Sequence, residues 1–143
     1  MKRIFLIIVL LGTALLAEFT RTNLVVSDTT TNLEWSDHEV LEKDWMEAIT
    51  YCENLTLDTN DNWRLPNIQE LFTIVGGKDV KDSSYPNSLN SIFENGSILD
   101  KYWSSTTIDN IKNSAYRIYV RYGTTETSSK TNSNNVRCVR NMD

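Results

Sequence analysis

Residues 63–67, Trp-Arg-Leu-Pro-Asn, are the stretch of sequence that decides the fold. Pro66 favours an extended conformation for the residue before it. Asn67 can then cap a helix, and Glu70, three positions later, completes a capping box. The apolar residues that follow recur at helical spacing: Ile68, Leu71, Phe72 and Val75. The motif therefore predicts an extended segment that turns directly into a short helix with one buried face.

Another helix is predicted before this motif, with strands around the pair. Asp44 and Glu47 form a second capping box. The apolar face that follows consists of Trp45, Ala48, Ile49, Cys52 and Leu55. Segments that alternate or are bounded by turn residues predict strands at 23–27, 33–36, 102–106, 115–122, 124–129 and 136–140. Residues 78–101 hold many turn formers, which predicts a long loop region.

The strand predicted at 115–122 separates two kinds of side chain, because successive side chains of a strand point to opposite faces. One face carries Tyr116, Ile118, Val120 and Tyr122. The other carries Arg117, Tyr119 and Arg121. Two guanidinium groups that flank an aromatic ring can hold sulfate or carboxylate while the ring stacks on a sugar. The alternatives are a solvated sheet face, or a basic sheet neutralised by the acidic half of the chain.

The first 17 residues have the layout of a secretory signal peptide. Lys2 and Arg3 precede residues 4–17, of which 12 are apolar, and Ala17 is a small residue at the exit. This apolar segment is too short to span a bilayer comfortably. We therefore expect residues 1–17 to be a signal peptide and 18–143 to form a single domain, secreted or periplasmic, with no membrane span after cleavage. Retention of the signal as an anchor stays open.

The chain holds two cysteines, Cys52 and Cys138. Exported proteins commonly join such a pair in a disulfide, and both residues lie on the predicted core-facing sides of their elements. The bridge would close a loop of about 86 residues, which by the chain-entropy estimate stabilises the fold by roughly 4.5 kcal/mol. Two cysteines are too few for a zinc site with four thiolate ligands.

Charge is unevenly distributed along an acidic chain. The formal net charge is −5 and the isoelectric point is near 4.9, which argues against nucleic acid as a partner. Residues 18–100 carry 16 acidic and 5 basic side chains, whereas residues 101–143 carry 3 acidic and 7 basic ones. An anionic ligand would therefore have to bind the C-terminal segment.

Five motifs in one order resemble the DUF1566 family, also called the Legionella collagen-like protein C-terminal domain family. They are residues 28–35, 45–52, 62–67 with Glu70-Leu71, 102–106 and 136–140. The resemblance implies a C-type-lectin-like α+β fold with two helices, a curled antiparallel sheet and long loops. Its best-known member carries the domain behind a collagen-like stalk as a trimeric adhesin for sulfated polysaccharide. This chain has no such stalk, and it has Asn32 and Asn62 where the family usually has Gly and Asp.

On this basis we expect a non-catalytic, adhesin-like recognition domain of the bacterial envelope that binds anionic polysaccharide or a cell-surface protein. The expected ligand-binding residues are Arg117, Tyr119, Arg121 and Trp103. The alternative is a structural or assembly subunit of an envelope or pilus-like complex, and a homo-oligomer stays open. An enzyme acting on envelope polymers is the least supported interpretation. His38, the single histidine, lies in a polar stretch without a catalytic signature, and we expect it at the surface.

The remaining motif residues are expected to be structural. Trp35, Trp45 and Trp63 are expected in the core, with a sugar-stacking platform as the alternative and Trp103 as the exception. The others in this group are Arg64, Pro66, Arg137 and Arg140. Arg64 is expected to bond turn carbonyls or a carboxylate such as Asp61, rather than an anionic ligand.

No cofactor is expected, although one metal site stays open. Asp58, Asn60 and Asn62 have the spacing that begins a calcium loop. The EF-hand pattern then fails, because Trp63 and Gln69 stand where Gly and Glu are required. A looser calcium site remains the alternative to a solvated turn, since lectin-like folds often hold one.

Overall fold

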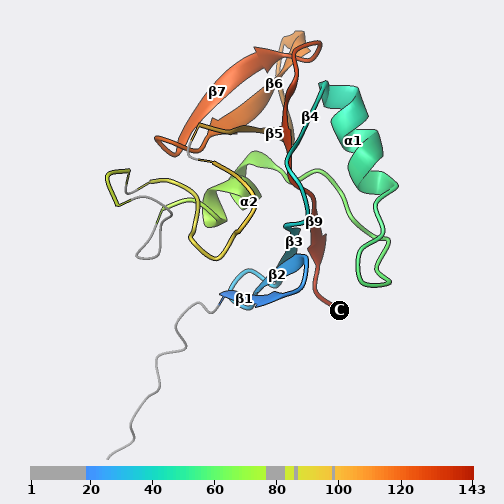
Figure 1. The fold of residues 1–143 in the computed structure, drawn as a ribbon. Helices are drawn as coiled ribbons and strands as arrows, with labels where there is room; N and C mark the ends of the chain where they lie inside the picture. The colour runs from blue at the N-terminus through green and yellow to red at the C-terminus, as the bar shows by residue number, and fades with distance from the viewer. Residues whose placement is uncertain (1–18, 77–82, 86, 98) are drawn as a thin grey trace, which may run out of the picture.

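The computed structural model describes residues 19–76, 83–85, 87–97 and 99–143. The predicted signal peptide, residues 1–17, lies outside the described residues. Within them the chain forms two short helices and nine strands, so the mixed α+β class is confirmed. In chain order (Figure 1) the elements are β1 (Phe19–Thr22), β2 (Val25–Asp28), β3 (Leu33–Ser36), β4 (Leu41–Lys43), α1 (Trp45–Glu53), α2 (Ile68–Thr73), β5 (Lys101–Ile108), β6 (Ile111–Tyr119), β7 (Thr124–Ser129), β8 (Asn134–Val136) and β9 (Val139–Asn141).

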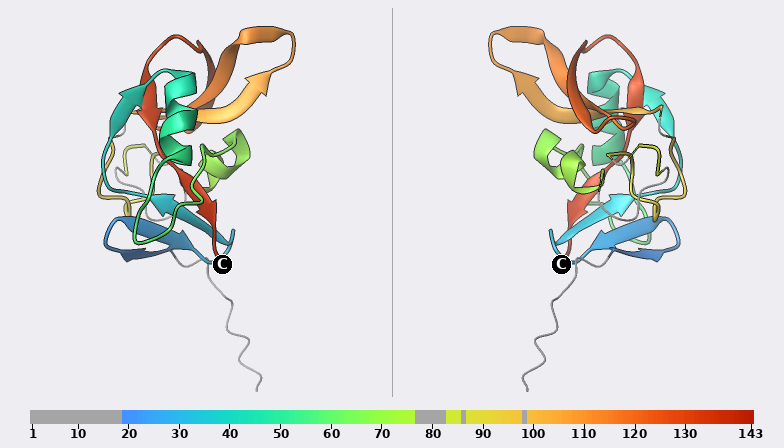
Figure 2. Two further views of the ribbon diagram at one scale, coloured as in Figure 1. Left: turned by 90° about the vertical axis from the view of Figure 1, so that its right-hand side faces the viewer. Right: turned by 90° about the vertical axis from the view of Figure 1, so that its left-hand side faces the viewer.

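The strands form two sheets that lie one above the other in Figure 1. Sheet A has the order β1-β2-β3-β9, and sheet B has the order β4-β8-β5-β6-β7. The β5–β8 pair is parallel, and the other pairs are antiparallel. The tip of the β5–β6 hairpin projects from the body of the domain (Figure 2). Sheet B therefore offers both a covered part and a protruding part.

The prediction of a single strand at 136–140 is wrong, because this segment is divided between β8 and β9, which belong to different sheets. The break falls at Arg137 and Cys138, both buried. The backbone N–H of Cys138 donates to the Ser36 hydroxyl instead of continuing a strand ladder, at 2.9 Å. Arg137 and Cys138 thus turn the chain from sheet B to sheet A.

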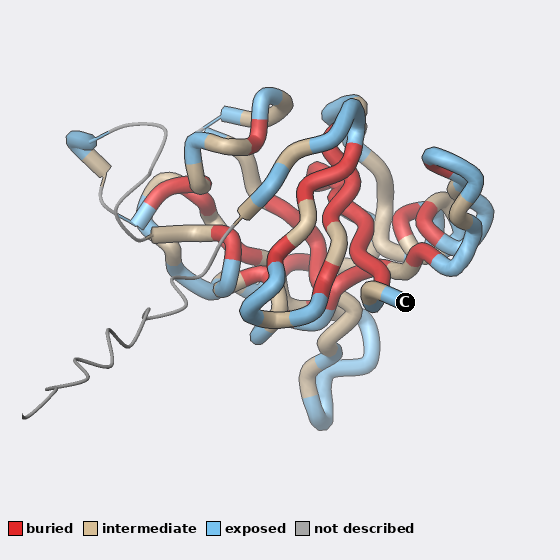
Figure 3. The backbone as a smooth tube through the Cα atoms, turned by 90° about the horizontal axis from the view of Figure 1, so that it is seen from below, coloured by how far each residue is buried: buried red, intermediate tan, exposed pale blue. Residues whose placement is uncertain are grey.

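Two apolar clusters cover opposite faces of sheet B. One contains α2 residues such as Leu71 with Tyr102 and Ile118 of the sheet. The other contains Ala48 and Cys52 of α1 with Trp103 and further residues of β6 and β8. Figure 3 shows the buried segments concentrated in the centre of the domain. The alternation along β6 therefore has the predicted sense, with Ile118 directed to the core.

Both predicted capping boxes are present. The Asp44 side chain accepts from the backbone of Glu47, and the Asn67 side chain accepts from the backbone of Glu70. Trp63 is buried as expected, and its indole N–H donates to the Asn60 carbonyl at 3.0 Å. Residues 63–67 therefore lead from a buried tryptophan into a capped helix.

Arg64 is bound within the fold, but its partner differs from the predicted Asp61. It donates two hydrogen bonds of 2.7 Å to the carboxylate of Glu70, because the capping box already directs Glu70 back along the chain. Burial raises the pKa of Glu70, but the bonds from Arg64 and from the backbone of Asn67 outweigh burial and hold that pKa below its ordinary value.

Asn32 and Asn62 both have structural roles. Asn32 has φ of 58°, a left-handed conformation that Asn tolerates better than most residues. The Asn62 side-chain oxygen accepts from Arg140 at 3.2 Å. Arg140 also donates to Glu34 at 2.6 Å, so it links the segment at 62 to sheet A.

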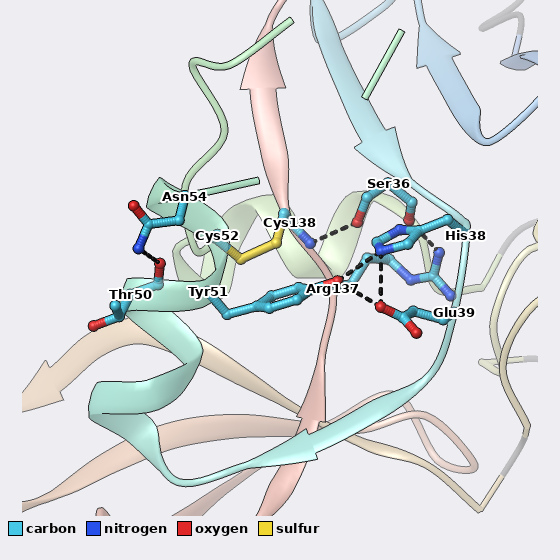
Figure 4. The surroundings of a disulfide bond; sticks show 9 residues. All are labelled: Ser36, His38, Glu39, Thr50, Tyr51, Cys52, Asn54, Arg137 and Cys138. Carbon is cyan, nitrogen blue, oxygen red and sulfur yellow. Dashed lines mark hydrogen bonds and ion pairs between the residues drawn. A yellow bond between two sulfur atoms is a disulfide. The ribbon is translucent and has the colours of Figure 1, made fainter. Parts of the chain in front are cut away.

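The predicted disulfide between Cys52 and Cys138 is present, with a Cα–Cα distance of 5.5 Å. It joins α1 to the turn between β8 and β9 and is fully buried (Figure 4). It therefore links the outer helix to the point where the two sheets meet.

Strand β6 ends earlier than predicted. It stops at Tyr119, and a turn follows that is closed by hydrogen bonds from Tyr122 to Tyr119 and from Gly123 to Val120. Gly123 has φ of 61°, and a side chain there would lie within 2.9 Å of Asn87. The sequence places Tyr122 on the same strand face as Ile118 and Val120, which are buried, but the turn leaves Tyr122 49% exposed.

Candidate ligand-binding surface

The predicted site residues Arg117 and Tyr119 lie on the face of sheet B that α1 partly covers. Arg117 is opposite Trp103 of β5, and Tyr119 is opposite Lys101. Trp103 is completely buried and donates its indole N–H to the Lys43 carbonyl at 2.9 Å. The expectation that Trp103 is exposed is therefore wrong, because α1 and β4 cover it. The accessible β5 side chain on this face is therefore Lys101, which is 33% exposed, and not the indole ring of Trp103.

Arg117 is partly enclosed by side chains of neighbouring strands. Its Nη1 donates to the Asn134 side chain at 2.7 Å. Its Nε and Nη2 donate to Glu126 at 3.1 and 2.8 Å, and Lys101 lies 3.1 Å from the same carboxylate oxygen. Partial burial raises the pKa of Glu126, but Lys101 and Arg117 outweigh it and hold that pKa below its ordinary value. Two cations and one carboxylate thus form one cluster of ion pairs.

Arg121 lies in the turn after β6, among three tyrosines. Its guanidinium is 4.5 Å from the ring centroid of Tyr85 and 5.4 Å from that of Tyr122, and it donates to the Tyr85 hydroxyl. Bonds to Tyr85 and then Tyr119 raise the pKa of Arg121. Tyr119 and Tyr122 meet edge to face at 5.3 Å. We call Tyr85, Tyr119, Tyr122 and Arg121 the tyrosine cluster.

Lys101 connects the tyrosine cluster to a polar groove. Its ammonium lies 4.6 Å from the ring centroid of Tyr119, and Lys101 also lines the groove. The groove has a volume of about 380 Å³. Its lining residues are Glu42, Leu99, Asp100, Lys101, Arg117, Ser133, Asn134 and Asn135. The buried amide nitrogen of Asn134 has no hydrogen-bond partner among the described residues. The structure thus joins Arg117, Tyr119 and Arg121 in one surface.

A second hollow, of about 590 Å³, lies along α1. It is lined by Lys43, Met46, Glu47, Thr50, Tyr51, Asn54, Leu55 and Thr56. Figure 4 shows two of its residues at the end of the helix, where the Asn54 side-chain amide donates a hydrogen bond to the Thr50 backbone carbonyl. Their hydrogen-bonding capacity is partly used within the helix. Of the two hollows, only the groove in sheet B is lined by an arginine.

The expectation of a surface histidine is wrong, because the His38 side chain is only 16% exposed. Its ring is nearly parallel to the Tyr51 ring, with centroids 6.2 Å apart, and its Nε2 lies 2.6 Å from the Tyr51 hydroxyl (Figure 4), so the two rings meet end to end through this hydrogen bond. Tyr51 donates to Glu39 at 2.9 Å. Burial, then the bond to Glu39, raises the pKa of Tyr51 well above its ordinary value. His38 is thus held between α1 and the segment that leads to β4.

Arg137 forms the most deeply buried charge cluster. It donates to Asp37 at 2.9 Å and to the Ser36 carbonyl at 2.6 Å. Its guanidinium lies 4.5 Å from the ring centroid of Phe93. Arg21 binds the same Asp37 from β1. Because Arg137 is 2% exposed and both of its terminal nitrogens bond to Asp37 and neighbouring groups, it is part of the framework, as the sequence predicts.

Two general features of the described ranges bear on the kind of site. No three His, Cys, Asp or Glu side chains within these ranges converge so that they could hold a metal ion. No described helix is long and apolar enough to cross a membrane.

Several members of the surface were not predicted. Glu126 and Lys101 could have been found from the hairpin pairing, because the turn at Gly123 places Glu126 opposite Arg117. Tyr85 and Asn134 had no such signal. Tyr85 lies in a loop far from β6 in sequence, and Asn134 precedes the strand break at Arg137, which sequence periodicity did not show.

Comparison with known proteins agrees with the motif pattern. A search of curated proteins finds no match. A family model described as the Lcl C-terminal domain matches residues 24–140, which spans every described element except β1 and the last residue of β9. The chain therefore belongs to the Lcl C-terminal domain family.

Proposed function

We propose that this domain is a non-catalytic recognition module outside the cytoplasm that binds anionic polysaccharide. The binding surface consists of the groove in sheet B and the tyrosine cluster. The observation that carries the proposal is a connected basic surface on an otherwise acidic chain. Lys101 lies over the ring of Tyr119 and shares Glu126 with Arg117, and Arg121 bonds to Tyr119. Guanidinium groups bind sulfate and carboxylate through paired hydrogen bonds, and tyrosine rings offer apolar faces to sugars.

The remaining expectations fit this proposal. Residues 18–143 would form the mature domain after removal of a signal peptide at 1–17. The buried disulfide suits an oxidising compartment such as the periplasm or the cell exterior. The two helices and two mainly antiparallel sheets suit a C-type-lectin-like arrangement. Binding would need no cofactor.

A second candidate is an assembly subunit that binds protein. The hollow along α1 favours it, because Met46 at its rim is 60% exposed. The two candidates use different surfaces and can therefore be separated by mutation.

The test is titration of heparin against the mature domain at 0.05 M and 0.5 M salt (~14 Å and ~4 Å Debye length). Wild type should bind at low salt and weaken at high salt. Arg117→Gln with Arg121→Gln should reduce affinity at least about ten-fold, since two charge-assisted contacts are lost. The charge-matched control is Lys43→Gln with Lys112→Gln, which lies outside the surface and should change affinity much less. Equal losses in both double variants, or no binding by wild type at low salt, would contradict the proposal.

A further inference from the structure

The carboxylate of Glu126 occupies the place that an external anion would take. One oxygen accepts from Nε and Nη2 of Arg117, at 3.1 and 2.8 Å, and lies 3.1 Å from the ammonium of Lys101. The other nitrogen of the guanidinium, Nη1, bonds to Asn134 and Ser128. The contacts of Nε and Nη2 with Glu126 are thus the ones that a ligand would have to replace.

The register of the hairpin places the two side chains within reach of each other. Arg117 and Glu126 are directly opposite each other on β6 and β7, which places their side chains on the same face of the sheet. The side chain of Glu126 is 32% exposed and that of Arg117 is 19% exposed. Solvent, and therefore a ligand, can reach the pair.

We infer that Glu126 is a built-in competitor, which occupies Arg117 and Lys101 until an external anion displaces it. This inference rests on the proposed function and adds the residue that sets its selectivity. A tethered carboxylate acts at a high effective concentration, in the millimolar range for short connections. A single small anion therefore competes poorly. A chain with several sulfate or carboxylate groups competes better, because its other groups hold it near the site through Arg121.

Glu126 is ionised, and can therefore compete with an external anion, throughout the neutral pH range. The pKa of Glu126 lies below its ordinary value, against the effect of partial burial, because Lys101 and Arg117 stabilise the ionised form. Neutralisation by mutation therefore separates the competitor from the rest of the surface more cleanly than a change of pH.

The experiment compares Glu126→Gln with Glu53→Gln. Glu53 is exposed at the end of α1 and outside the groove, and its replacement makes the same change in net charge. Inorganic sulfate is titrated at constant ionic strength while the Nε–H signal of Arg117 is followed by NMR. We expect Glu126→Gln to lower the apparent Kd for sulfate roughly three- to ten-fold, since each partly exposed ion pair is worth up to about five-fold. Glu53→Gln should stay within about two-fold of wild type.

Equal gains in both variants would show a general effect of charge and overturn the inference. A loss of sulfate binding in Glu126→Gln would show that Glu126 positions Arg117, and would also overturn it. A parallel heparin titration distinguishes the proposed function from the inference. If Glu126→Gln gains sulfate affinity while neither protein binds heparin, the role of Glu126 as a competitor is supported. The proposal that the domain binds anionic polysaccharide is then contradicted.

Discussion

Two arginine–carboxylate clusters in this domain use the same chemistry in opposite surroundings. Arg137 and Asp37 meet where sheet B passes into sheet A, with side chains 2% and 0% exposed. Arg117 and Glu126 meet on the face of sheet B, with side chains 19% and 32% exposed. Arg137 contacts backbone carbonyls and aromatic rings as well as Asp37. The hydrogen bonds of the Arg117 guanidinium go to side chains, of which Glu126 is the most exposed.

The difference in surroundings determines what each arginine does. A buried ion cannot be left without its partner, because the cost of desolvation is no longer offset. Arg137 and Asp37 must therefore stay together for the chain to fold. An exposed pair contributes little to stability and exchanges partners readily. Arg117 is therefore available to a ligand, and the predictions below test this division.

The largest expected effect is at the buried cluster. Asp37→Ala leaves the charge of Arg137 without a partner and should lower the free energy of unfolding by about 3–5 kcal/mol. Arg137→Met should cost less, because Asp37 keeps its contacts with Arg21 and with the backbone N–H groups of Glu94 and Asn95. Urea unfolding of the purified variants measures both. A domain that keeps wild-type stability after Asp37→Ala would show that this cluster is not structural.

The disulfide beside this cluster should come next. Replacement of Cys52 and Cys138 by alanine should lower the free energy of unfolding by about 2–5 kcal/mol, since the bridge closes a long loop. Mass spectrometry of wild type from an oxidising compartment should detect no free thiol. Two reactive thiols in folded material would be inconsistent with the structure.

An intermediate effect is expected at Arg64 and Glu70, whose side chains are 41% and 16% exposed. Glu70→Gln should cost about 1 kcal/mol at neutral pH. Because the pKa of Glu70 is lowered in the folded state, its contribution is present above the ordinary value of 4.5 and is lost as the pH falls through the folded-state pKa. The stability difference between wild type and Glu70→Gln should therefore shrink below about pH 4.5. A stability difference between the two proteins that grows on acidification would contradict a lowered pKa of Glu70 in the folded state.

The smallest effect on stability is expected at the exposed cluster. Arg117→Gln should lower the free energy of unfolding by no more than about 1 kcal/mol, since Gln can still bond to Asn134 and the lost ion pair is exposed. Thermal unfolding measures this directly. A loss as large as that of Asp37→Ala would show that Arg117 belongs to the framework, and would remove the contrast between the clusters.

Local signals predicted the framework well, and contacts between distant segments were hard to predict. Both capping boxes and the alternation along β6 depend on residues a few positions apart, and the structure confirms them. Asp37 lies in a polar stretch that suggests a solvated surface, yet it is completely buried because Arg137 reaches it from 100 residues away. The same holds for Trp103, which is covered by α1 and β4. The basic strand was predicted, but its competitor and its tyrosine cluster depend on pairing and turn geometry.

The most direct test of the central claim is to map where a heparin hexasaccharide contacts the mature domain. Backbone amide signals are followed by NMR during titration at low salt. The account predicts that the shifts concentrate at Lys101, residues 117–122 and Asn134, and that signals near Arg137 and Asp37 stay unchanged. Shifts concentrated along α1, or spread evenly over the domain, would contradict the claim that the groove in sheet B and the tyrosine cluster form the binding surface.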